Sequence, residues 1–419
     1  MTMKPMVSFV TNSLKDAGMR DEPLLTTVPS DKERDCVEAL GFVSVFILLP
    51  FLSLTALGSS SILAVIAIVL IGGFLIYRGA SLGAVKVSSV AIAFAALFAW
   101  MVILLPLDPS LSALLRIVQF VSCAIVFAFA VFARKSAFAV RVLQVSVAAM
   151  LTLVFAAWIF EGMPFSNYMC FWDNANVFSF VVFCWAAVLL VNFNRASIPF
   201  LAISVLLIFV SSARTTALAF AVLVLMWLYL RGKVLDVRMK RRIRILFVVV
   251  CVLVALFMIF YIATYDTSLG VYLDELSRQY LHKGFYSGRQ RLWGGIFQAI
   301  NESPFFGQGL SALPADFLDT GLSSHNLYLQ VLLQSGYVGL FLLIVLLWLI
   351  MERLMSQPMD NNVALSIAMI VAVVIQETFE VCLLQNHLMV GLMMWMIIGV
   401  GIKHRIRATQ VRFACDCEK

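Results

Sequence analysis

Long apolar runs recur along almost the whole chain and restrict what it can fold into. A helix needs about 20 mainly apolar residues to cross the hydrocarbon core of a bilayer. By that criterion we predict twelve spans, near residues 38–57, 61–77, 88–106, 113–133, 140–160, 175–192, 197–212, 215–231, 245–264, 337–351, 362–383 and 386–402. The predicted fold is an all-α polytopic membrane protein.

Composition supports this fold class. Hydrophobic residues make up 62% of the 419 residues and charged residues only 13%, whereas soluble domains are roughly half apolar and a quarter charged. The eight cysteines are scattered and form no CxxC pair, so we expect neither a zinc site nor a disulfide framework. The excess apolar surface indicates lipid as its surroundings.

The basic residues predict the orientation of the spans, because Lys and Arg of short loops are retained in the cytoplasm. An even number of spans leaves most of them inside: Arg78, Lys86, Arg134, Lys135, Arg141, Arg195, the cluster Arg231–Arg244, Arg353, Lys403, Arg405 and Arg407. The outer side keeps Arg116, Arg214, Arg278, Lys283, Arg289 and Arg291. We therefore interpret the net charge of +7 as topological anchoring rather than nucleic-acid binding.

This topology divides the chain into five parts. Residues 1–37 form a cytoplasmic segment without the apolar core of a signal peptide, and residues 38–264 hold the first nine spans. Residues 265–336 form one large outer loop, residues 337–402 the last three spans, and residues 403–419 a cytoplasmic tail. Any chemistry is expected in the outer loop.

The outer loop has helical periodicity. We predict amphipathic helices over 271–281, with Leu273, Leu276 and Tyr280 on one face, and from an N-cap at Ser287, with Leu292, Ile296, Phe297 and Ile300 on one face. A third is expected to begin after Ser323 and Ser324 and to break at Gly336. Such helices would lie against the outer interface of the bundle.

Basic residues near the outer surface are the first candidates for a site. Arg214 interrupts two apolar runs, where an arginine is costly and usually faces an anion or a water-filled cavity. Arg289 and Arg291 occupy the first turn of a predicted helix, whose free N–H groups also favour anions. Guanidinium groups grip phosphate with paired hydrogen bonds, so these arginines could form a pyrophosphate clamp; headgroup contact for Arg214 and a solvated turn for Arg289 and Arg291 are the alternatives.

Other polar residues complete the candidate site. His325 follows two serines at a helix start, where the helix dipole and nearby arginines favour a neutral imidazole able to accept a proton; a structural cap is the alternative. Glu377 and Glu380 lie three residues apart, and so on one helix face, in the outer part of the eleventh predicted span. We favour an ion pair with Arg116 or Arg214 over orientation of a catalytic group or of acceptor hydroxyls. Asp173, Asn174 and Asn176 make a poor metal cage, and we expect a turn that caps the sixth span.

A family resemblance emerges from the outer loop. The stretches SGRQRLWGGIFQAINESPFFGQGL and SSHNLYLQVLLQSGYVGLFLL resemble the shared signature of bacterial O-antigen ligases and related polymerases. The matching residues are Gly288, Arg289, Trp293, Pro304, Gly307, Gly309, His325, Asn326, Tyr328, Leu329, Gly336 and Gly339. Upstream, only the Ser-x-Arg at Ser212–Arg214 matches beyond span count and loop placement.

The resemblance implies a metal-independent, cofactor-free glycosyltransferase of the bacterial inner membrane. It would take a glycan from undecaprenyl pyrophosphate on the periplasmic side and transfer it, with inversion, to lipid A-core in lipopolysaccharide biosynthesis. The family's pyrophosphate-binding arginines map onto Arg214 and Arg289, and its catalytic histidine maps onto His325. Further candidates for binding the pyrophosphate or the acceptor are Arg116, Arg291, Asn326, Glu377 and Glu380.

Three other functions stay open at this point: an O-antigen polymerase, another transferase of lipid-linked glycans in the same superfamily such as a protein O-oligosaccharyltransferase, and a flippase or transporter. O-antigen polymerases of the same superfamily usually have a second large outer loop near mid-chain, whereas residues 161–174 are short here, which favours a ligase. A flippase or transporter for lipid-linked sugars would also have about twelve spans and cationic residues. Its charges would line a central cavity, whereas the polar residues of this chain collect at the outer helix ends.

Overall fold

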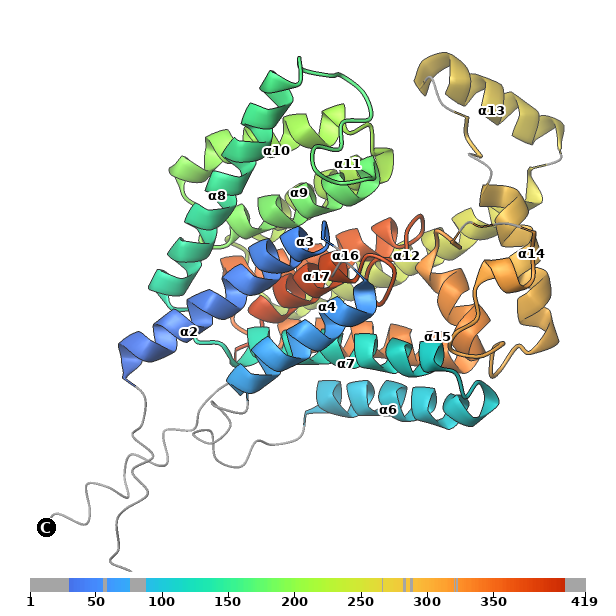
Figure 1. Cartoon of the computed structure of the whole chain (residues 1–419), viewed down its shortest axis with the longest axis horizontal. Helices are drawn as coiled ribbons and strands as arrows, with labels where there is room; N and C mark the ends of the chain where they lie inside the picture. Colours follow the sequence, from blue (N-terminus) through green and yellow to red (C-terminus); the bar gives the residue numbers. More distant parts are fainter. Residues whose placement is uncertain are drawn as a thin grey trace, which may run out of the picture.

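The structure is a computed structural model, and it describes residues 30–55, 59–75, 88–265, 267–281, 284–286, 289–319, 321 and 323–403. Within these ranges the regular structure is entirely helical, with no strand (Figure 1). The elements are α2 (Asp31–Val43), η1 (Ser44–Leu48), α3 (Leu49–Leu52), α4 (Ser60–Ala67), η2 (Ile68–Gly72), α6 (Ser89–Leu104), η3 (Leu105–Leu107), α7 (Leu111–Phe132), α8 (Ala137–Phe160), α9 (Ala175–Leu190), η4 (Arg195–Ser197), α10 (Ile198–Val210), α11 (Arg214–Leu230), α12 (Val237–Ala263), α13 (Ser268–Leu281), α14 (Arg289–Glu302), η5 (Pro314–Asp316), α15 (Leu327–Met355), α16 (Asn361–Gln376) and α17 (Leu388–Val400).

Among the described residues, six helices are long and apolar enough to cross a membrane. They cover Asp31–Leu52, Ser89–Leu107, Leu111–Phe132, Ala137–Phe160, Val237–Ala263 and Leu327–Met355. Shorter apolar helices cover Ser61–Leu75, Ala175–Leu190, Arg195–Val210, Arg214–Leu230, Asn361–Gln376 and Leu388–Val400. Each of the twelve predicted spans thus coincides with an apolar helix, and six of these helices meet the length needed for crossing.

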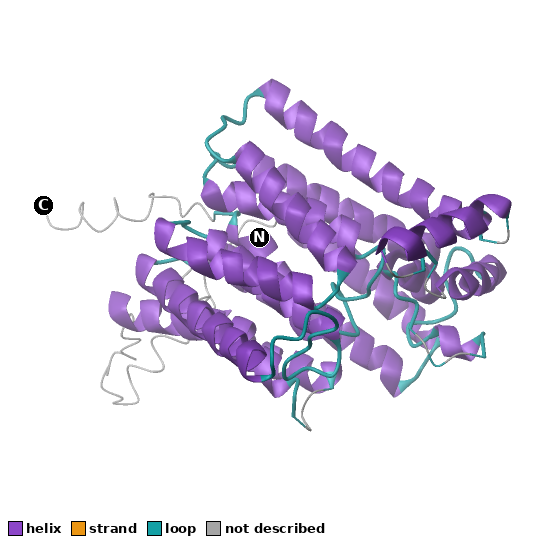
Figure 2. Cartoon of the chain, turned by 90° about the horizontal axis from the view of Figure 1, so that it is seen from above, coloured by secondary structure: helices purple, strands orange, loops and turns teal. Residues whose placement is uncertain are grey.

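Three of the shorter helices lie inside the bundle, and the other described helices surround them. Helices α9, α16 and α17 bury nearly all of their residues, as expected for helices that are apolar on every side. Outer helices expose apolar side chains instead: on α12, Leu253, Leu256 and Ile259 are 59%, 55% and 61% exposed. Seen from above, the helices run side by side in one bundle (Figure 2). Such apolar outer faces fit a lipid environment.

Helix starts follow from local sequence. Side chains that precede the first turn accept a hydrogen bond from a free backbone N–H, as Ser, Asn and Asp caps do. The capping residues are Ser30, Ser59, Ser88, Ser110, Ser136, Asn174, Asp236, Asn326 and Asp360. The expected turn that caps the sixth predicted span is confirmed, with Asn174 as the N-cap of α9.

Three ion pairs join connecting segments at one end of the bundle. Ion pairs join Arg134 to Asp31 at 2.7 Å, Arg244 to Glu352 at 2.6 Å and Lys403 to Asp360 at 2.5 Å. Each pair links two segments that the charge distribution assigns to the inner side. The loop helices α13 and α14 lie at the opposite end from the start of α2 (Figure 1). The contacts agree with the predicted grouping, and the side that each end faces stays a prediction.

The loop helices behave differently from one another. Helix α14 packs against α12 and α15 and buries Leu292, Ile296 and Ile300, as predicted. Helix α13 stands apart from the bundle (Figure 1), and Leu276 and Tyr280 on its predicted packing face are 38% and 69% exposed. The expectation that α13 packs with this face is wrong, because other residues attach it to the protein.

The attachment of α13 uses one glycine and one carboxylate. Gly270 packs against the backbone of Thr264 at the end of α12, so closely that an added Cβ atom would lie 2.0 Å from the Thr264 oxygen. The carboxylate of Asp274 accepts a hydrogen bond from the backbone N–H of Phe285 at 2.7 Å. The opposite face of α13 is therefore left uncovered by the described residues.

The break predicted at Gly336 is present, although α15 begins later than expected. The N-cap is Asn326, which captures the N–H of Leu329 at 3.0 Å, rather than Ser323 or Ser324. Gly336 adopts φ 66° and ψ −170° inside α15, and a Cβ atom there would lie 2.2 Å from the backbone oxygen of Phe305. Gly307, in the loop after α14, makes the matching approach: a Cβ atom added there would lie 2.6 Å from backbone atoms of Gln334 and Ser335. The glycines of the signature thus let two backbones touch.

We expect Gly336→Ala to lower the free energy of unfolding by at least about 1 kcal/mol, because the φ and ψ values of Gly336 lie in a region that is essentially restricted to glycine. The overlap with Phe305 adds to that cost. The measurement is the melting temperature of the purified protein in detergent. Gly73→Ala is the matched control, because a Cβ atom there meets nothing within 4 Å. Equal melting temperatures for the two variants would contradict this account of the break.

Candidate functional site

One carboxylate connects three distant parts of the chain at the end of the bundle that carries α14. Glu380 Oε1 lies 3.4 Å from Nη2 of Arg289 and accepts a hydrogen bond from Nδ2 of Asn176 at 3.2 Å. Glu380 Oε2 lies 3.4 Å from Nδ1 of His325. The Glu380 side chain is only 5% exposed, whereas Arg289 and His325 keep 20% and 32% of their side chains open. The carboxylate is buried behind a basic group and an imidazole that remain accessible.

Glu380 reaches this place because α16 is shorter than the predicted span. The helix ends at Gln376, and Glu377 turns its carboxylate back onto the backbone N–H groups of Cys382 and Leu383, at 2.9 and 3.2 Å. The chain therefore folds back on itself instead of continuing as a helix. The prediction that Glu377 and Glu380 share one helix face is wrong for this reason: Glu377 closes the turn, and Glu380 emerges from it.

His325 is fixed by its neighbours. Its own backbone adopts a φ of 46°, a region that is costly for a residue other than glycine and that persists where the surroundings enforce it. The backbone oxygen of Ser324 accepts a hydrogen bond from the Trp293 indole at 2.9 Å. On the other side, Asn326 donates to the backbone oxygen of Thr378 at 2.8 Å, and the N–H of Leu327 donates to that of Glu377 at 2.9 Å. These contacts hold the imidazole beside Glu380.

Arg289 and Trp293 act from the same helix. They are one turn apart on α14 and so lie on one face. Arg289 meets Glu380, while its guanidinium carbon lies 5.7 Å from the centre of the Phe379 ring, within the range of a cation–π contact. Trp293 is fully buried and packs on Tyr261 at 4.9 Å between ring centres. One helix therefore places a guanidinium and orients the histidine segment.

Arg214 is the first residue of α11 and follows a turn in which Ser212 has φ 59°. Its side chain is exposed. Among the described residues it has no hydrogen-bond or ion-pair partner. Arg214 and Arg289 both lie close enough to the Tyr261 hydroxyl to interact with it electrostatically. No hydrogen bond or ion pair within the described part of the chain joins Arg214 to Arg289, His325 or Glu380, and the exposed guanidinium of Arg214 is open to a ligand at the start of α11.

Several predicted residues lie elsewhere or have other roles. Arg116 donates to the side chain of Gln119 at 3.0 Å and lines a separate cavity of about 50 Å³. The favoured ion pair of the glutamates with Arg116 or Arg214 is wrong, since Glu380 meets Arg289. Asn326 is fully buried and uses both ends of its amide to position its neighbours. Gly288 and the side chain of Arg291 lie outside the described residues.

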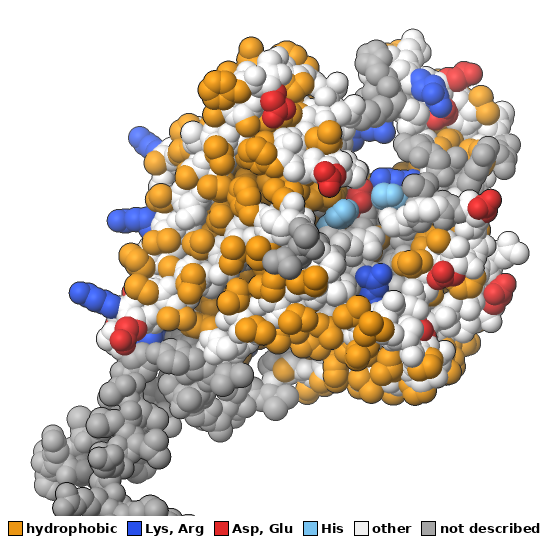
Figure 3. Space-filling view, in the orientation of Figure 1, with side chains coloured by type: hydrophobic (Ala, Val, Ile, Leu, Met, Phe, Trp, Pro, Cys, Tyr) orange, Lys and Arg blue, Asp and Glu red, His pale blue; other side chains and the backbone are white. Residues whose placement is uncertain are grey.

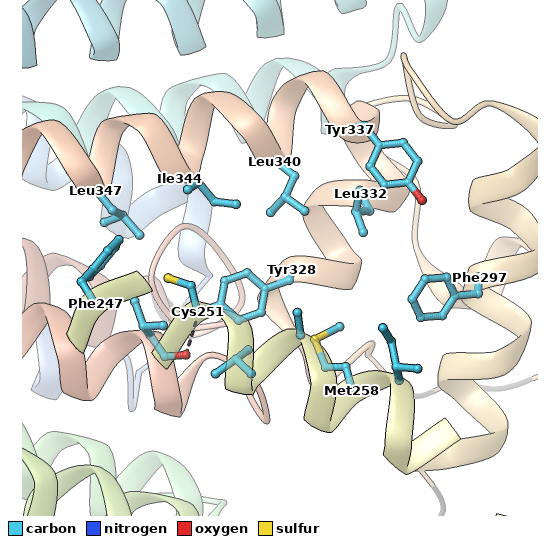
Figure 4. A pocket seen from close by; sticks show the side chains of 14 residues that line it. Phe247, Cys251, Met258, Phe297, Tyr328, Leu332, Tyr337, Leu340, Ile344 and Leu347 are labelled. Atoms are coloured by element: carbon cyan, nitrogen blue, oxygen red, sulfur yellow. Dashed lines mark hydrogen bonds between the residues drawn. The ribbon is translucent and has the colours of Figure 1, made fainter. Parts of the chain in front are cut away.

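An apolar cavity of about 260 Å³ runs between α12 and α15. It extends from Phe247 and Leu347 at one end to Phe297 and Tyr337 at the other, and Tyr328 forms part of its wall (Figure 4). The Tyr328 hydroxyl is satisfied by the backbone oxygen of Val374 at 2.7 Å. The cavity thus offers hydrocarbon surroundings along two long helices and ends beside α14, the helix that carries Arg289.

The surface around the site is hollowed. Figure 3 shows histidine, basic and acidic side chains gathered in one recess, while apolar side chains cover much of the remaining surface. Sequence reasoning missed three members of this site: Asn176, Phe379 and Tyr261. Asn176 had a signal, since three polar residues stand together between apolar runs, but only the fold brings its amide to Glu380. Within the described ranges, no three His, Cys, Asp or Glu side chains come together as metal ligands would.

Comparison with known families agrees with the resemblance. Residues 199–344 match the family model described as O-antigen ligase, so the predicted relationship is confirmed over this segment, which includes Arg214, Arg289 and His325. Asn176 and Glu380 lie outside the matched segment. A search of curated proteins gives no match. The matched segment covers about a third of the chain, and the six long apolar helices of the described residues fit a multi-pass membrane protein.

Proposed function

We propose, starting from the O-antigen ligase match of residues 199–344, that this protein is an O-antigen ligase of the bacterial inner membrane. It would transfer a glycan from undecaprenyl pyrophosphate to lipid A-core on the periplasmic side, with both termini in the cytoplasm. The observation that carries the proposal is the meeting of Arg289 and His325 on the two oxygens of Glu380, at 3.4 Å each. The buried carboxylate of Glu380 thus contacts both a group able to bind anions, Arg289, and a group able to accept a proton, His325.

The histidine supplies the base. Glu380 lies at Nδ1 of His325, so a proton on Nδ1 directed at this carboxylate leaves Nε2 free to accept another. Buried acids orient catalytic histidines in the same way in other enzymes. Nε2 would take the proton of an acceptor hydroxyl as its oxygen forms a bond to the anomeric carbon. Glu380 is then a positioning residue, which was the less favoured of the two roles considered for it from sequence.

The arginines serve the leaving group. As the new bond forms, the bond from the anomeric carbon to the pyrophosphate oxygen breaks, and undecaprenyl pyrophosphate leaves with the bonding electrons. Arg289 and Arg214 would bind this pyrophosphate and stabilise the charge that develops on it. Arg291 is a further candidate for the same anion. The donor is already activated, so no nucleotide or other energy source is required.

The apolar cavity between α12 and α15 suits the polyprenyl chain of the donor. Its lining is almost entirely hydrocarbon, and it ends at Phe297, two turns beyond Arg289 on α14. A lipid chain in this cavity would bring its pyrophosphate toward the arginines. The chain would enter from bilayer hydrocarbon that is as apolar as the cavity lining, so the cavity would orient the donor rather than supply its affinity for the membrane.

A ligase is preferred to a polymerase because of the segment between α8 and α9. Residues 161–174 form a short loop that ends at Asn174, the N-cap of α9. The chain therefore has no second large loop between these two helices. The experiment that tests the proposal is transfer in vitro with purified lipid-linked O-antigen and two acceptors offered separately. Glycan on lipid A-core supports the ligase, and longer lipid-linked chains would identify a polymerase. No transfer to either acceptor, with movement of the donor across vesicles, would identify a flippase.

We expect the same assay to proceed in the presence of excess EDTA, with the rate changed less than twofold to threefold. In the proposed reaction the arginines neutralise the pyrophosphate, so chelation removes nothing that the step requires. Rates with EDTA and with added Mg²⁺ or Mn²⁺ are compared directly. A transfer rate that falls to background with EDTA and returns with one of these ions would contradict the proposed chemistry.

A further inference from the structure

A second cavity, of about 180 Å³, lies on the α9 side of Glu380. It is bounded by the turn after α3, by α4, by the start of α9 and by the turn before α17. Its wall contains Trp172, Asp173, Asn174, Asn386 and His387 together with apolar side chains. Unlike the cavity between α12 and α15, it therefore combines an aromatic ring with a carboxylate, amides and an imidazole.

The second cavity is connected to the proposed catalytic group. Asn174 caps α9, and two residues later Asn176 donates to Glu380 at 3.2 Å. His387 lines the cavity and lies close enough to Glu380 and His325 to interact electrostatically with both. A molecule in this cavity would therefore lie beside His387 and the start of α9, the helix from which Asn176 reaches Glu380.

Trp172 gives this cavity a rigid wall. Its ring packs on Phe51, Phe178 and Trp185, with ring centres 5.8–6.3 Å apart, and the side chain is 4% exposed. The buried indole N–H has no acceptor among the residues that the structure describes. A buried donor without a partner is unfavourable, and a hydroxyl or a water molecule in the cavity would supply the missing acceptor.

These groups match the chemistry of a sugar ring. A pyranose has an apolar face of C–H groups that packs on aromatic rings and a rim of hydroxyls that donate and accept hydrogen bonds. Carboxylate, amide and imidazole groups pair with hydroxyls of both kinds. A water molecule occupies about 30 Å³ in the liquid, so a cavity of about 180 Å³ has room for several waters or for one sugar ring.

We propose that this cavity binds the acceptor, as a single sugar ring of the glycan that receives the transferred chain; this inference rests on the function proposed above. An in-line displacement requires the attacking hydroxyl and the leaving pyrophosphate to lie on opposite sides of the anomeric carbon. Arg289 and the apolar cavity place the leaving group on the α14 side of Glu380. The acceptor then approaches from the α9 side, where the second cavity lies, and its hydroxyl meets His325 between them.

The test measures the two substrates separately in the purified protein. The acceptor probe is rough lipopolysaccharide, which lacks O-antigen, and the donor is lipid-linked O-antigen. We expect Asp173→Asn to raise KM for rough lipopolysaccharide about tenfold, the effect of weakening one hydrogen bond to a charged group. KM for the donor and kcat at saturating acceptor stay within twofold of the unmodified protein. Trp172→Phe, which keeps the aromatic packing, raises the same KM.

Glu161→Gln is the matched control, since it makes the same chemical change in the segment between α8 and α9 but does not line the cavity. Unchanged acceptor KM in both Asp173→Asn and Trp172→Phe would overturn the acceptor site, as would an equal rise in donor KM. These results differ from failure of the proposed function, in which the unmodified protein transfers no glycan to rough lipopolysaccharide.

Discussion

Replacing His325 with alanine should slow glycan transfer about 10²- to 10⁴-fold, which is the usual contribution of a positioned general base. The reason is local: Nδ1 of His325 lies 3.4 Å from Glu380, so removal of the ring removes the proposed base. The measurement is single-turnover transfer with donor and acceptor both saturating. Lipid-linked glycan accumulates in cells that carry the variant.

The His325 result has two controls. His325→Asn keeps a polar side chain of similar size, and we expect it to be as slow as His325→Ala while melting at the same temperature as the unmodified protein. Glu380→Gln leaves the imidazole in place but weakens its orientation, so its loss should be smaller than that of His325→Ala. Normal transfer by His325→Ala would remove the base from the mechanism.

Arg289→Ala should reduce kcat about 10²- to 10³-fold, as loss of one group that stabilises developing charge does in other enzymes. The guanidinium has five N–H donors, and its single contact with Glu380 leaves others for the pyrophosphate. Arg289→Lys keeps the charge but not the paired geometry, so it should restore only part of the rate. Transfer is followed with purified donor as for His325.

Arg278→Ala is the matched control for Arg289→Ala. Arg278 also lies on a loop helix, but its side chain is 68% exposed and pairs with Asp274 at 2.7 Å on α13. We expect this variant to retain full activity. Similar losses in the two variants would mean that the loop needs positive charge in general, and the specific role of Arg289 would be wrong.

The membrane helices could be predicted well because their signal is local. Each predicted span coincides with an apolar helix, since burial in hydrocarbon requires a continuous apolar run whatever its neighbours are. Turn signals were also local: Asn174 and Gly336 act as their residue types suggest. The eleventh span was drawn too long because Cys382 and Leu383 are apolar, and their role as hydrogen-bond donors to Glu377 depends on a backbone turn that hydrophobicity does not report.

The partners of charged groups were predicted less well. Glu380 was expected to pair with Arg116 or Arg214, and it meets Arg289 instead, because α14 docks against α12 and α15 and carries its first residue to the end of α16. The packing face of α13 was also predicted wrongly, since periodicity marks an apolar face without showing what covers it. A pairing between residues 91 positions apart is set by helix packing, which no local pattern encodes.

The sequence by itself determined the helical membrane class, the cap at Asn174 and the break at Gly336, and the short set of basic and acidic residues proposed to act on a pyrophosphate. Those properties follow from the cost of placing polar groups in lipid and from the conformational freedom of single residues. Tertiary structure alone decided that Glu380 supports both Arg289 and His325 and that Asn176 joins them. Such contacts arise only when α9, α14 and the turn after α16 meet, because their geometry belongs to the packed bundle as a whole.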